Sequence, residues 1–241
     1  MEKKLKLPKK GEFLTFLDTV SKISDSAILN VKEDKLTSLV SSIDNTLILY
    51  CEYAIPSEFE DTLNIPDIKK LARVIDTLDS DKVNLTINSN NIQYSGDSVK
   101  FKYHLFEDGF LANPNLNLEK INKFDFDVEF NLDKSTLQQI FKGSNFTSET
   151  NKIYFYTEDG KLMAELTDRA RHNTDNFSLC LGWKSNSFNL NPTPVNFDNI
   201  RLLSIINNQF KVKINTSYGV VVFEIEESDI KLKYIISTLT Q

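Results

Sequence analysis

The chain has 241 residues, of which 40% are hydrophobic and 17 are phenylalanine, so it can build a sizeable core in one large domain or two smaller ones. Its formal net charge of −6 excludes a protein that grips nucleic acid through a broadly basic surface, but not one that gathers cations on a single face. No apolar run approaches the ~18 residues that cross a bilayer, and no leader or cysteine framework is evident, so we expect a soluble intracellular protein without a membrane partner.

Four short segments space their apolar side chains at the interval of an amphipathic helix. The second begins at Pro66, which suits a first helical position, and the third follows Asp133, a residue typical of an N-cap. The predicted helices span residues 9–23, 66–78, 134–142 and 198–206.

The segments between these helices are rich in β-branched and aromatic residues and are bounded by Asn, Asp, Gly or Ser, which is typical of strands joined by turns. A helix, several strands, a second helix and further strands follow one another twice, which predicts an α+β fold with mostly antiparallel sheets. The predicted strands span residues 26–31, 46–53, 83–87, 99–105, 152–156, 177–183, 210–214, 220–225 and 231–236.

Two pairs of short motifs indicate that the second half of the chain is a diverged copy of the first. Residues 33–36 (Glu-Asp-Lys-Leu) return about 125 positions later as residues 158–162 (Glu-Asp-Gly-Lys-Leu). Residues 63–65 and 195–197 each place an asparagine between two apolar residues before a helix, about 132 positions apart. Coincidence in a chain rich in Asn and Lys is the alternative interpretation.

The expected join between the two copies has turn chemistry and an uneven apolar pattern, in which Gly109 and Pro114 interrupt the apolar residues. We therefore predict a first domain over residues 1–108, an interdomain connector over 109–124 and a second domain over 125–241. Each domain is expected to place two helices on antiparallel sheets.

The sequence shows no constellation that predicts catalysis or metal binding. His104 and His172 have no Cys or carboxylate at metal-ligand spacing, and the 7 glycines form no phosphate loop. The densest ionisable cluster, residues 168–172, is interpreted as a solvated turn between strands rather than an acid–base site. Cys180 alternates with leucines and is interpreted as a small strand residue. We expect no enzymatic activity and no cofactor.

Residues 137–142, together with 153–156 and 158–162, resemble the second domain of the sliding clamps of T-even-type phages. The order of elements is similar to that of the wider family of clamps of the proliferating-cell-nuclear-antigen type. The resemblance covers nearly the whole chain in pattern, and its residue-level match is confined to 133–162. The first helix departs from it, because residues 13–17 are more apolar than the family pattern.

This resemblance implies a DNA polymerase processivity factor, a DNA-clamp fold of two pseudo-repeated domains that assembles as a homotrimeric ring around duplex DNA. An ATP-dependent clamp loader would open the ring, and the ring would tether the DNA polymerase. A phage-encoded chain would work in the cytoplasm of a bacterial host. Recognition would be of the DNA backbone, so no base-reading groups are expected.

Cations lie opposite the apolar stripes of the predicted helices and so offer a lining for such a ring. Those of the second helix are the strongest candidates, whereas Lys9 and Lys10 stand near a helix N-terminus, where the dipole disfavours cations. Ordinary exposed charge is the alternative for each. The predicted DNA-binding residues are Lys69, Lys70, Arg73, Lys9, Lys10, Lys22, Lys134, Lys142 and Arg201.

Two strands alternate large apolar side chains with polar or small ones, a pattern that suits edge strands at a contact between subunits. By analogy with clamp subunit boundaries, we expect them to pair head to tail between protomers. The lysines of the first strand have the alternative role of protecting an unpaired edge. The predicted interface residues are Val99, Phe101, Tyr103, Leu105, Phe177, Leu179, Leu181 and Trp183.

Partners of clamps insert a short apolar peptide into a groove beside the interdomain connector, so the resemblance implies candidates for such a groove by position. Ordinary core or strand packing is the alternative for each of them. The candidates are Leu39, Val40, Ile43, Leu111, Leu116, Leu118, Tyr234, Ile235 and Ile236.

Two other functions stay open from the sequence. A monomeric processivity factor of the same fold would bind duplex DNA directly and with a steep salt dependence. A β-rich structural or adaptor protein, such as a virion component, would have no DNA contact, and the cations on the helix faces disfavour it.

Overall fold

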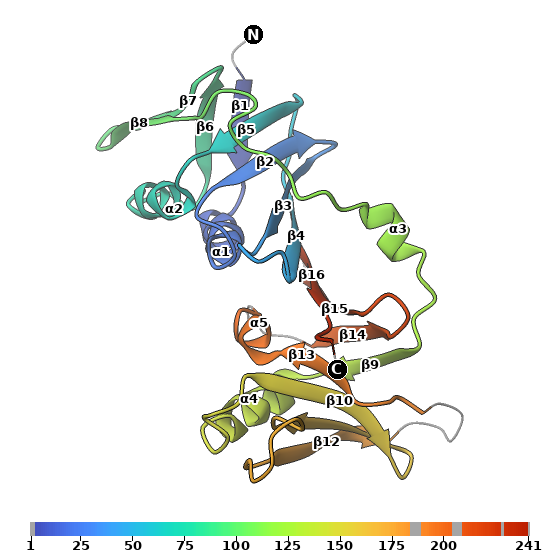
Figure 1. Cartoon of the computed structure of the whole chain (residues 1–241). Coiled ribbons are helices and arrows are strands. Elements are labelled where there is room, and N and C mark those ends of the chain that lie inside the picture. Colours follow the sequence, from blue (N-terminus) through green and yellow to red (C-terminus); the bar gives the residue numbers. More distant parts are fainter. Residues whose placement is uncertain (1–2, 184–188, 204–208, 228, 241) are drawn as a thin grey trace. The chain divides into compact units, whose positions relative to one another are not determined.

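The computed structural model describes residues 3–183, 189–203, 209–227 and 229–240 of an α+β chain (Figure 1). The chain divides into two compact units. The first contains Met1–Leu116 and Glu226–Lys233, and the second contains Asn117–Ile225 and Tyr234–Gln241. This architecture confirms the predicted fold class.

The first half of the chain runs from a strand and a helix through four strands to a second helix and three more strands. These elements are β1 (Lys3–Leu7), α1 (Lys10–Ser21), β2 (Ala27–Lys32), β3 (Lys35–Ser41), β4 (Leu47–Ala54), β5 (Asp61–Ile65), α2 (Ile68–Asp76), β6 (Val83–Asn88), β7 (Asn91–Ser95) and β8 (Lys100–His104).

A short helix, α3 (Leu118–Asn122), follows, and the second half then repeats the same order. This repetition of elements agrees with the duplication that the motifs predict. The repeated elements are β9 (Val128–Leu132), α4 (Lys134–Gly143), β10 (Lys152–Glu158), β11 (Lys161–Leu166), β12 (Phe177–Trp183), β13 (Thr193–Asn196), α5 (Phe197–Arg201), β14 (Phe210–Asn215), β15 (Val220–Glu227) and β16 (Ile230–Ser237).

Each copy builds two sheets in the same strand order. In the first unit the orders are β1-β6-β7-β8 and β5-β2-β3-β4, with the start of β16 beside β4. In the second unit they are β13-β10-β11-β12 and β9-β14-β15, with the end of β16 beside β15. Strands β8 and β12 are therefore edge strands, each with one neighbour among the described residues.

Both cores are built from apolar side chains that the helices and sheets contribute. In the first unit α1 and α2 lie side by side (Figure 1), and Phe13 and Phe16 of α1 pack on Tyr53 with ring centroids 6.3 Å apart. In the second unit Phe223 contacts both Phe155 and Phe210. Each large side chain buried in this way contributes roughly 1.5–3 kcal/mol to folding.

The helix and strand predictions are confirmed to within about two residues, with two exceptions. Pro66 precedes the second helix instead of opening it, because Asp67 is the N-cap and its side chain accepts a hydrogen bond from the Lys70 amide at 2.8 Å. The fourth helix ends at Arg201 rather than at residue 206, and residues 204–206 lie outside the described part of the chain.

The sequence interpretation missed α3 and seven strands: β1, β3, β5, β7, β9, β11 and β13. The second strands of two hairpins, β3 and β11, were not predicted, although each follows a two-residue turn whose residues have positive φ. Several of the others are five-residue strands rich in Lys or Asn, which have low strand propensity. Among the described residues no helix has the length and apolar character needed to span a bilayer.

Candidate nucleic-acid interface and subunit edges

Helix α2 separates a buried face from a charged one. Leu71 and Ile75 are fully buried against the first unit, and Lys69, Lys70 and Arg73 project from the exposed side. The N-cap fixes where the helix starts, so these three cations occupy fixed positions within about one and a half turns. The predicted cationic face therefore exists as one surface.

The three cations of α2 differ in their availability. The Lys69 ammonium lies 2.9 Å from the Asp25 carboxylate, in an exposed ion pair. Lys70 and Arg73 have no acidic group within ion-pair distance among the residues that the structure describes. Two free cations on one helix face can accept a phosphate without first breaking an ion pair.

Lys9, at the start of α1, is held by two carboxylates. Its ammonium lies 2.8 Å from Glu12 and 2.8 Å from Asp229, and hydrogen bonding to Asp229 and then to Glu12 raises the Lys9 pKa. The same hydrogen bond lowers the pKa of Asp229. Lys9 therefore links two segments of the first unit, and these ion pairs would have to break before Lys9 could bind DNA.

The other predicted cations of α1 also have partners inside the protein. The Lys10 ammonium donates to the backbone carbonyl of Leu78, and Lys22 lies 3.1 Å from the Asp18 carboxylate. An exposed ion pair is worth little, so the Lys22–Asp18 pair would cost little to break. Lys10 also donates to the Asp76 carbonyl at the end of α2, so its ammonium is engaged within the first unit.

The second unit carries fewer of the predicted cations. Lys134 is half-buried in the first turn of α4, and Lys142 is exposed in the last turn. The Arg201 guanidinium lies 4.7 Å from the Phe197 ring centroid and 3.3 Å from the Asp198 carboxylate. The structure thus brings the α2 cations together and leaves the remaining ones scattered over separate helices.

Edge strand β8 has a closely related counterpart inside the chain. Residues 100–103 (Lys-Phe-Lys-Tyr) return about 131 positions later as residues 231–234 (Lys-Leu-Lys-Tyr) in β16. The two strands occupy the same place in the two copies, because each is the last strand of its repeat. The sequence analysis missed this motif, although its offset agrees with that of the other repeats.

Equivalent positions in the two copies differ in burial. On β4, which lies beside β16, Cys51 is 0% exposed, and on β16 Leu232 is 2% exposed. Their counterparts on the edge strands, Leu179 of β12 and Phe101 of β8, are only half-buried. The edge strands expose the apolar rows that the paired strands β4 and β16 bury.

The pairing of β4 with β16 also has a defined register. The Ala54 amide donates to the Asp229 carbonyl at 2.8 Å, which in an antiparallel ladder places Glu52 opposite Lys231. The pKa of Lys231 is raised, chiefly by its hydrogen bond to Glu226 and to a lesser extent by the charge of Glu52. Lysine therefore faces a carboxylate across this junction.

The sheet β13-β10-β11-β12 of the second copy allows the register between β4 and β16 to be applied to the free edges β12 and β8. Thr37 of β3 pairs with Glu52, and Met163 of β11 pairs with Cys180. The turn motif shared by the two halves places Thr37 and Met163 at equivalent positions, so Cys180 takes the place of Glu52 and Lys100 that of Lys231. Cys180 is exposed, as an unpaired edge allows.

The remaining predicted edge residues keep their places on these strands. Tyr103 is buried, and its hydroxyl donates to the Asp67 carbonyl at 2.7 Å. Val99 and Leu105 flank β8 and are half-buried, as are Phe177 and Leu181 on β12. The side chain of Trp183 lies outside the described part of the structure.

The structure brings together only some of the predicted groove residues. Leu39, Val40 and Leu111 line a small cleft of about 100 Å³ in the first unit. Ile43 is fully exposed on a turn outside this cleft. Leu116 and Leu118 are half-buried and do not line it either.

The remaining groove candidates require a correction. Tyr234 and Ile236 are 0% exposed and Ile235 is 5% exposed, so these side chains belong to the core around β16. A buried side chain has no surface to offer a partner peptide. These residues were predicted from their position alone, and both faces of β16 are covered over this stretch.

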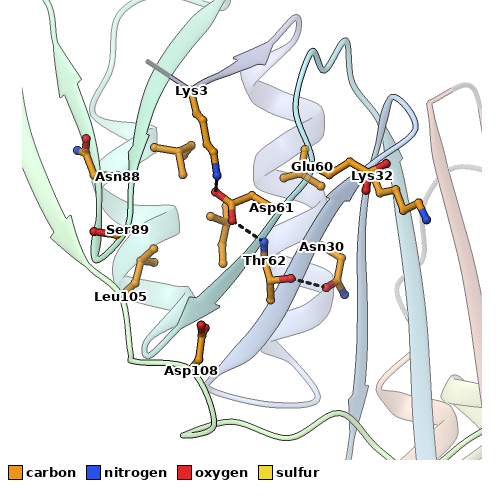
Figure 2. Close-up of a pocket in the computed structure, with 13 residues that line it drawn as sticks. Lys3, Asn30, Lys32, Glu60, Asp61, Thr62, Asn88, Ser89, Leu105 and Asp108 are labelled. Carbon is orange, nitrogen blue, oxygen red and sulfur yellow. Dashed lines mark hydrogen bonds and ion pairs between the residues drawn. The ribbon is translucent and has the colours of Figure 1, made fainter. Parts of the chain in front are cut away.

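A polar cleft of about 730 Å³ opens in the first unit between the edges of β1 and β5 (Figure 2). The Lys3 ammonium crosses it to the Asp61 carboxylate at 2.9 Å, and the Thr62 hydroxyl donates to the Asn30 side chain. Of the predicted site residues only Leu105 lines it. The Lys3–Asp61 ion pair therefore joins β1 to β5 across the cleft, whereas the Thr62–Asn30 hydrogen bond lies between the paired strands β5 and β2.

The cluster at residues 168–172 is the turn that the sequence predicts. The Asp168 carboxylate is 2.9 Å from the Lys152 ammonium, and that hydrogen bond is the chief cause of its lowered pKa. A carboxylate held ionised in this way is a poor proton acceptor. Within the described residues no group of His, Cys, Asp and Glu side chains is arranged to hold a metal ion.

Comparison with protein-family models finds no match, and comparison with curated proteins finds none either. Solved structures do match. The A. fulgidus PCNA bound to the C-terminal region of FEN-1 is 12% identical with a TM-score of 0.75, and the alignment covers 100% of this chain and 99% of that one. The Entamoeba histolytica proliferating cellular nuclear antigen is 12% identical with a TM-score of 0.75 over 99% of both chains.

A putative DNA polymerase III beta subunit from Eubacterium rectale is similar over a longer protein. It is 11% identical with a TM-score of 0.74, and the match covers 100% of this chain but 67% of that chain. At these identities the likeness establishes the fold.

Proposed function

We propose that this chain, whose fold is that of sliding clamps, is a non-enzymatic processivity factor that closes into a ring around duplex DNA and tethers the DNA polymerase. The observation that carries the proposal is the pair of half-buried edge strands, β8 and β12. They leave open the junction that the chain closes internally between β4 and β16.

The duplication supports ring closure. The fourth sheet strand of the first copy (β4) pairs with the last strand of the second copy (β16). The fourth sheet strand of the second copy (β12) and the last strand of the first (β8) are then left over. Pairing β8 of one protomer with β12 of the next repeats the internal junction, and it is a head-to-tail contact that continues until the ring closes.

The internal register predicts the contacts of the proposed junction. Leu179 would lie opposite Phe101 of the next protomer, and Cys180 opposite its Lys100. This contact would cover the apolar rows of both edges, which include the predicted interface residues. It replaces a lysine–carboxylate pair by a lysine facing a thiol, so the subunit junction is expected to be weaker than the internal one.

The length of the chain supports a trimer. It matches the PCNA structures over 99% of their length, whereas it spans only about two thirds of the bacterial beta subunit. A ring of a given circumference needs more copies of a shorter protomer. We therefore propose three copies, each of which contributes two domains joined by a connector over residues 109–124.

DNA would be held because it passes through the hole of the ring, not because the protein binds it tightly. A net charge of −6 opposes broad phosphate binding, while Lys70 and Arg73 supply two free cations on one helix face. Weak contacts of this kind keep the duplex centred and let the ring move. The remaining predicted cations would add weaker contacts, since those on α1 are already engaged within the protein.

The proposed partners follow from the same account. A polymerase peptide would use the cleft beside Leu39, Val40 and Leu111, and an ATP-dependent loader would open the β8–β12 junction. A phage gene expressed in the cytoplasm of a bacterial host is the proposed source. The alternatives are a monomeric DNA-binding factor and an adaptor protein without DNA contact.

Retention on DNA of different topology tests the proposal. After loading with a cognate clamp loader and ATP, the protein should stay on a nicked circular duplex. It should leave as soon as that circle is cut into a linear duplex of equal length. Equal retention on both would identify a monomeric factor that grips the duplex directly. No retention on either DNA would favour the adaptor interpretation.

A further inference from the structure

The sheet β1-β6-β7-β8 of the first unit is basic on its outer face. None of its strand residues, all of which the structure describes, is acidic. The strand registers place Lys4, Thr86, Gln93 and Lys102 in one row across the four strands. Directly opposite residues share one face of a sheet, so this row is a continuous line of cations and hydrogen-bond donors.

Neighbouring rows extend the same face. Lys6 lies opposite Asn84, and Lys100 lies opposite Ser95. Lys100 and Lys102 are exposed, and neither has an acidic partner within ion-pair distance in the described part of the chain. Lys6 pairs with Glu58, whose side chain is 84% exposed, and a pair so open to water is easily displaced.

The equivalent sheet of the second copy has the opposite design. There Lys211 lies 2.8 Å from Glu129, and Lys213 lies 2.8 Å from Glu224. These two lysines are therefore neutralised within the sheet. At this fold position Lys211 and Lys213 of the second copy are compensated, whereas Lys100 and Lys102 of the first copy have no described acidic partner, in a protein that is acidic as a whole.

We propose that this face of the first unit binds the phosphate backbone of duplex DNA from outside the ring. The lysines of β1 and of β8 stand about 14 Å apart, three interstrand spacings, which is close to the ~12 Å width of the major groove. Lys4 and Lys6 can meet the phosphates on one side of the groove, and Lys100 and Lys102 those on the other. Amide and hydroxyl groups between them are typical phosphate ligands.

The composition of the face favours a duplex over other occupants. The aromatic side chains of these strands, Tyr94, Phe101 and Tyr103, alternate to the inner face, so no stacking platform exists for single-stranded bases. The outer face also lacks the aromatic or aliphatic anchors at the centre of protein interfaces. Backbone electrostatics is the recognition that remains, and it does not depend on ring closure.

A duplex that cannot be threaded tests this proposal. We would measure binding of the whole protein to a fluorescent duplex of about 30 base pairs, blocked at both ends by bound streptavidin, in low salt and without loader. K4Q/K6Q and K100Q/K102Q should each weaken binding about 3- to 10-fold and lower the slope of log K against log salt by about 2. The control K211Q/K213Q makes the same change in net charge and should alter binding less than about twofold.

Several results would overturn the proposal. They are an absence of binding by the unmodified protein, equal weakening by the control pair, or capture of poly-glutamate with no affinity for the duplex, which would indicate an acidic protein partner. Sedimentation and thermal unfolding of each variant check assembly and folding. Failure of the ring proposal is seen separately, as equal retention of the unmodified protein on circular and linear DNA.

Discussion

The junction between β4 and β16 and the free edges β8 and β12 are built from equivalent residues, yet they end in different states. Leu232 and Cys51 are buried by their neighbours, whereas Phe101 and Leu179 are half-buried because no other described strand covers them. A duplicated chain can satisfy only one of its two repeat-to-repeat junctions internally. In the proposed ring, the second junction is the surface through which copies assemble.

The largest effect is expected from a charge at the open junction. Phe101→Asp would bury an unpaired carboxylate in each contact between protomers, at a cost of ~3 kcal/mol, so the dissociation constant should rise about 100-fold or more. Light scattering at a fixed high concentration should report monomers. The control Ser95→Asp adds the same charge to the exposed face of the same sheet and should leave the trimer intact. A trimer that persists in the Phe101 variant would show that β8 takes no part in assembly.

A smaller effect, on loading onto DNA, is expected from the cations of α2. Here the comparison is between cations without an ion-pair partner and one that is already paired. K70Q/R73Q should reduce loading onto circular duplex severalfold and flatten its salt dependence, since two phosphate contacts are lost. K69Q should have less effect than K70Q or R73Q alone, because the Lys69 ammonium already pairs with Asp25. Loading assays over a range of salt concentrations check this order. An equal effect of all three single variants would show that helix position matters and pairing does not.

The smallest effect is expected on folding stability, and it concerns the first helices of the two copies, α1 and α4. The Asp133 side chain accepts a hydrogen bond from the Thr136 amide at 2.6 Å and caps α4, whereas Lys9, the N-cap residue of α1, makes no side-chain cap hydrogen bond. Asp133→Ala should cost ~1 kcal/mol, a fall in Tm of about 2–4 °C by calorimetry at neutral pH. Asp133→Asn is the control and should keep most of the stability.

The pH dependence of this cap has a definite sign. Backbone hydrogen bonding from Thr136 holds the Asp133 pKa below its ordinary value of 3.8. The carboxylate therefore contributes its stabilisation above that value and loses it as the pH falls through the lowered pKa. Unfolding curves between pH 5 and pH 2 should show this loss in the unmodified protein and not in Asp133→Asn. Parallel curves for the two proteins would contradict the assignment.

Much of the fold could be predicted because it depends on local periodicity. The apolar spacing of Leu71 and Ile75 marks α2, and the alternation around Phe101 and Leu179 marks two strands that are edges in the structure. The offsets between repeated motifs gave the duplication. These signals lie within a few residues of one another, or recur at a constant offset, and so survive in a single sequence.

The availability of the charges could not be predicted, because it depends on contacts between distant residues. Lys9 and Asp229 are 220 positions apart, and Lys69 and Asp25 are 44 apart, yet each pair forms an ion pair. Burial on both faces of β16 was hidden for the same reason, and it removed Tyr234 from the groove. The Lys-x-Lys-Tyr motif was a readable signal that the sequence interpretation missed.

A single new cysteine tests the open junction most directly. Lys100→Cys should place a thiol opposite Cys180 of the next protomer at the ~5.5 Å Cα separation that suits a disulfide, while Cys51 stays inert because it is fully buried. After mild oxidation, denaturing electrophoresis should show a covalent trimer that reverts to monomer on reduction and that is absent from Lys100→Cys/Cys180→Ser. Only monomer after oxidation, or the same cross-links without Cys180, would contradict ring closure through β8 and β12.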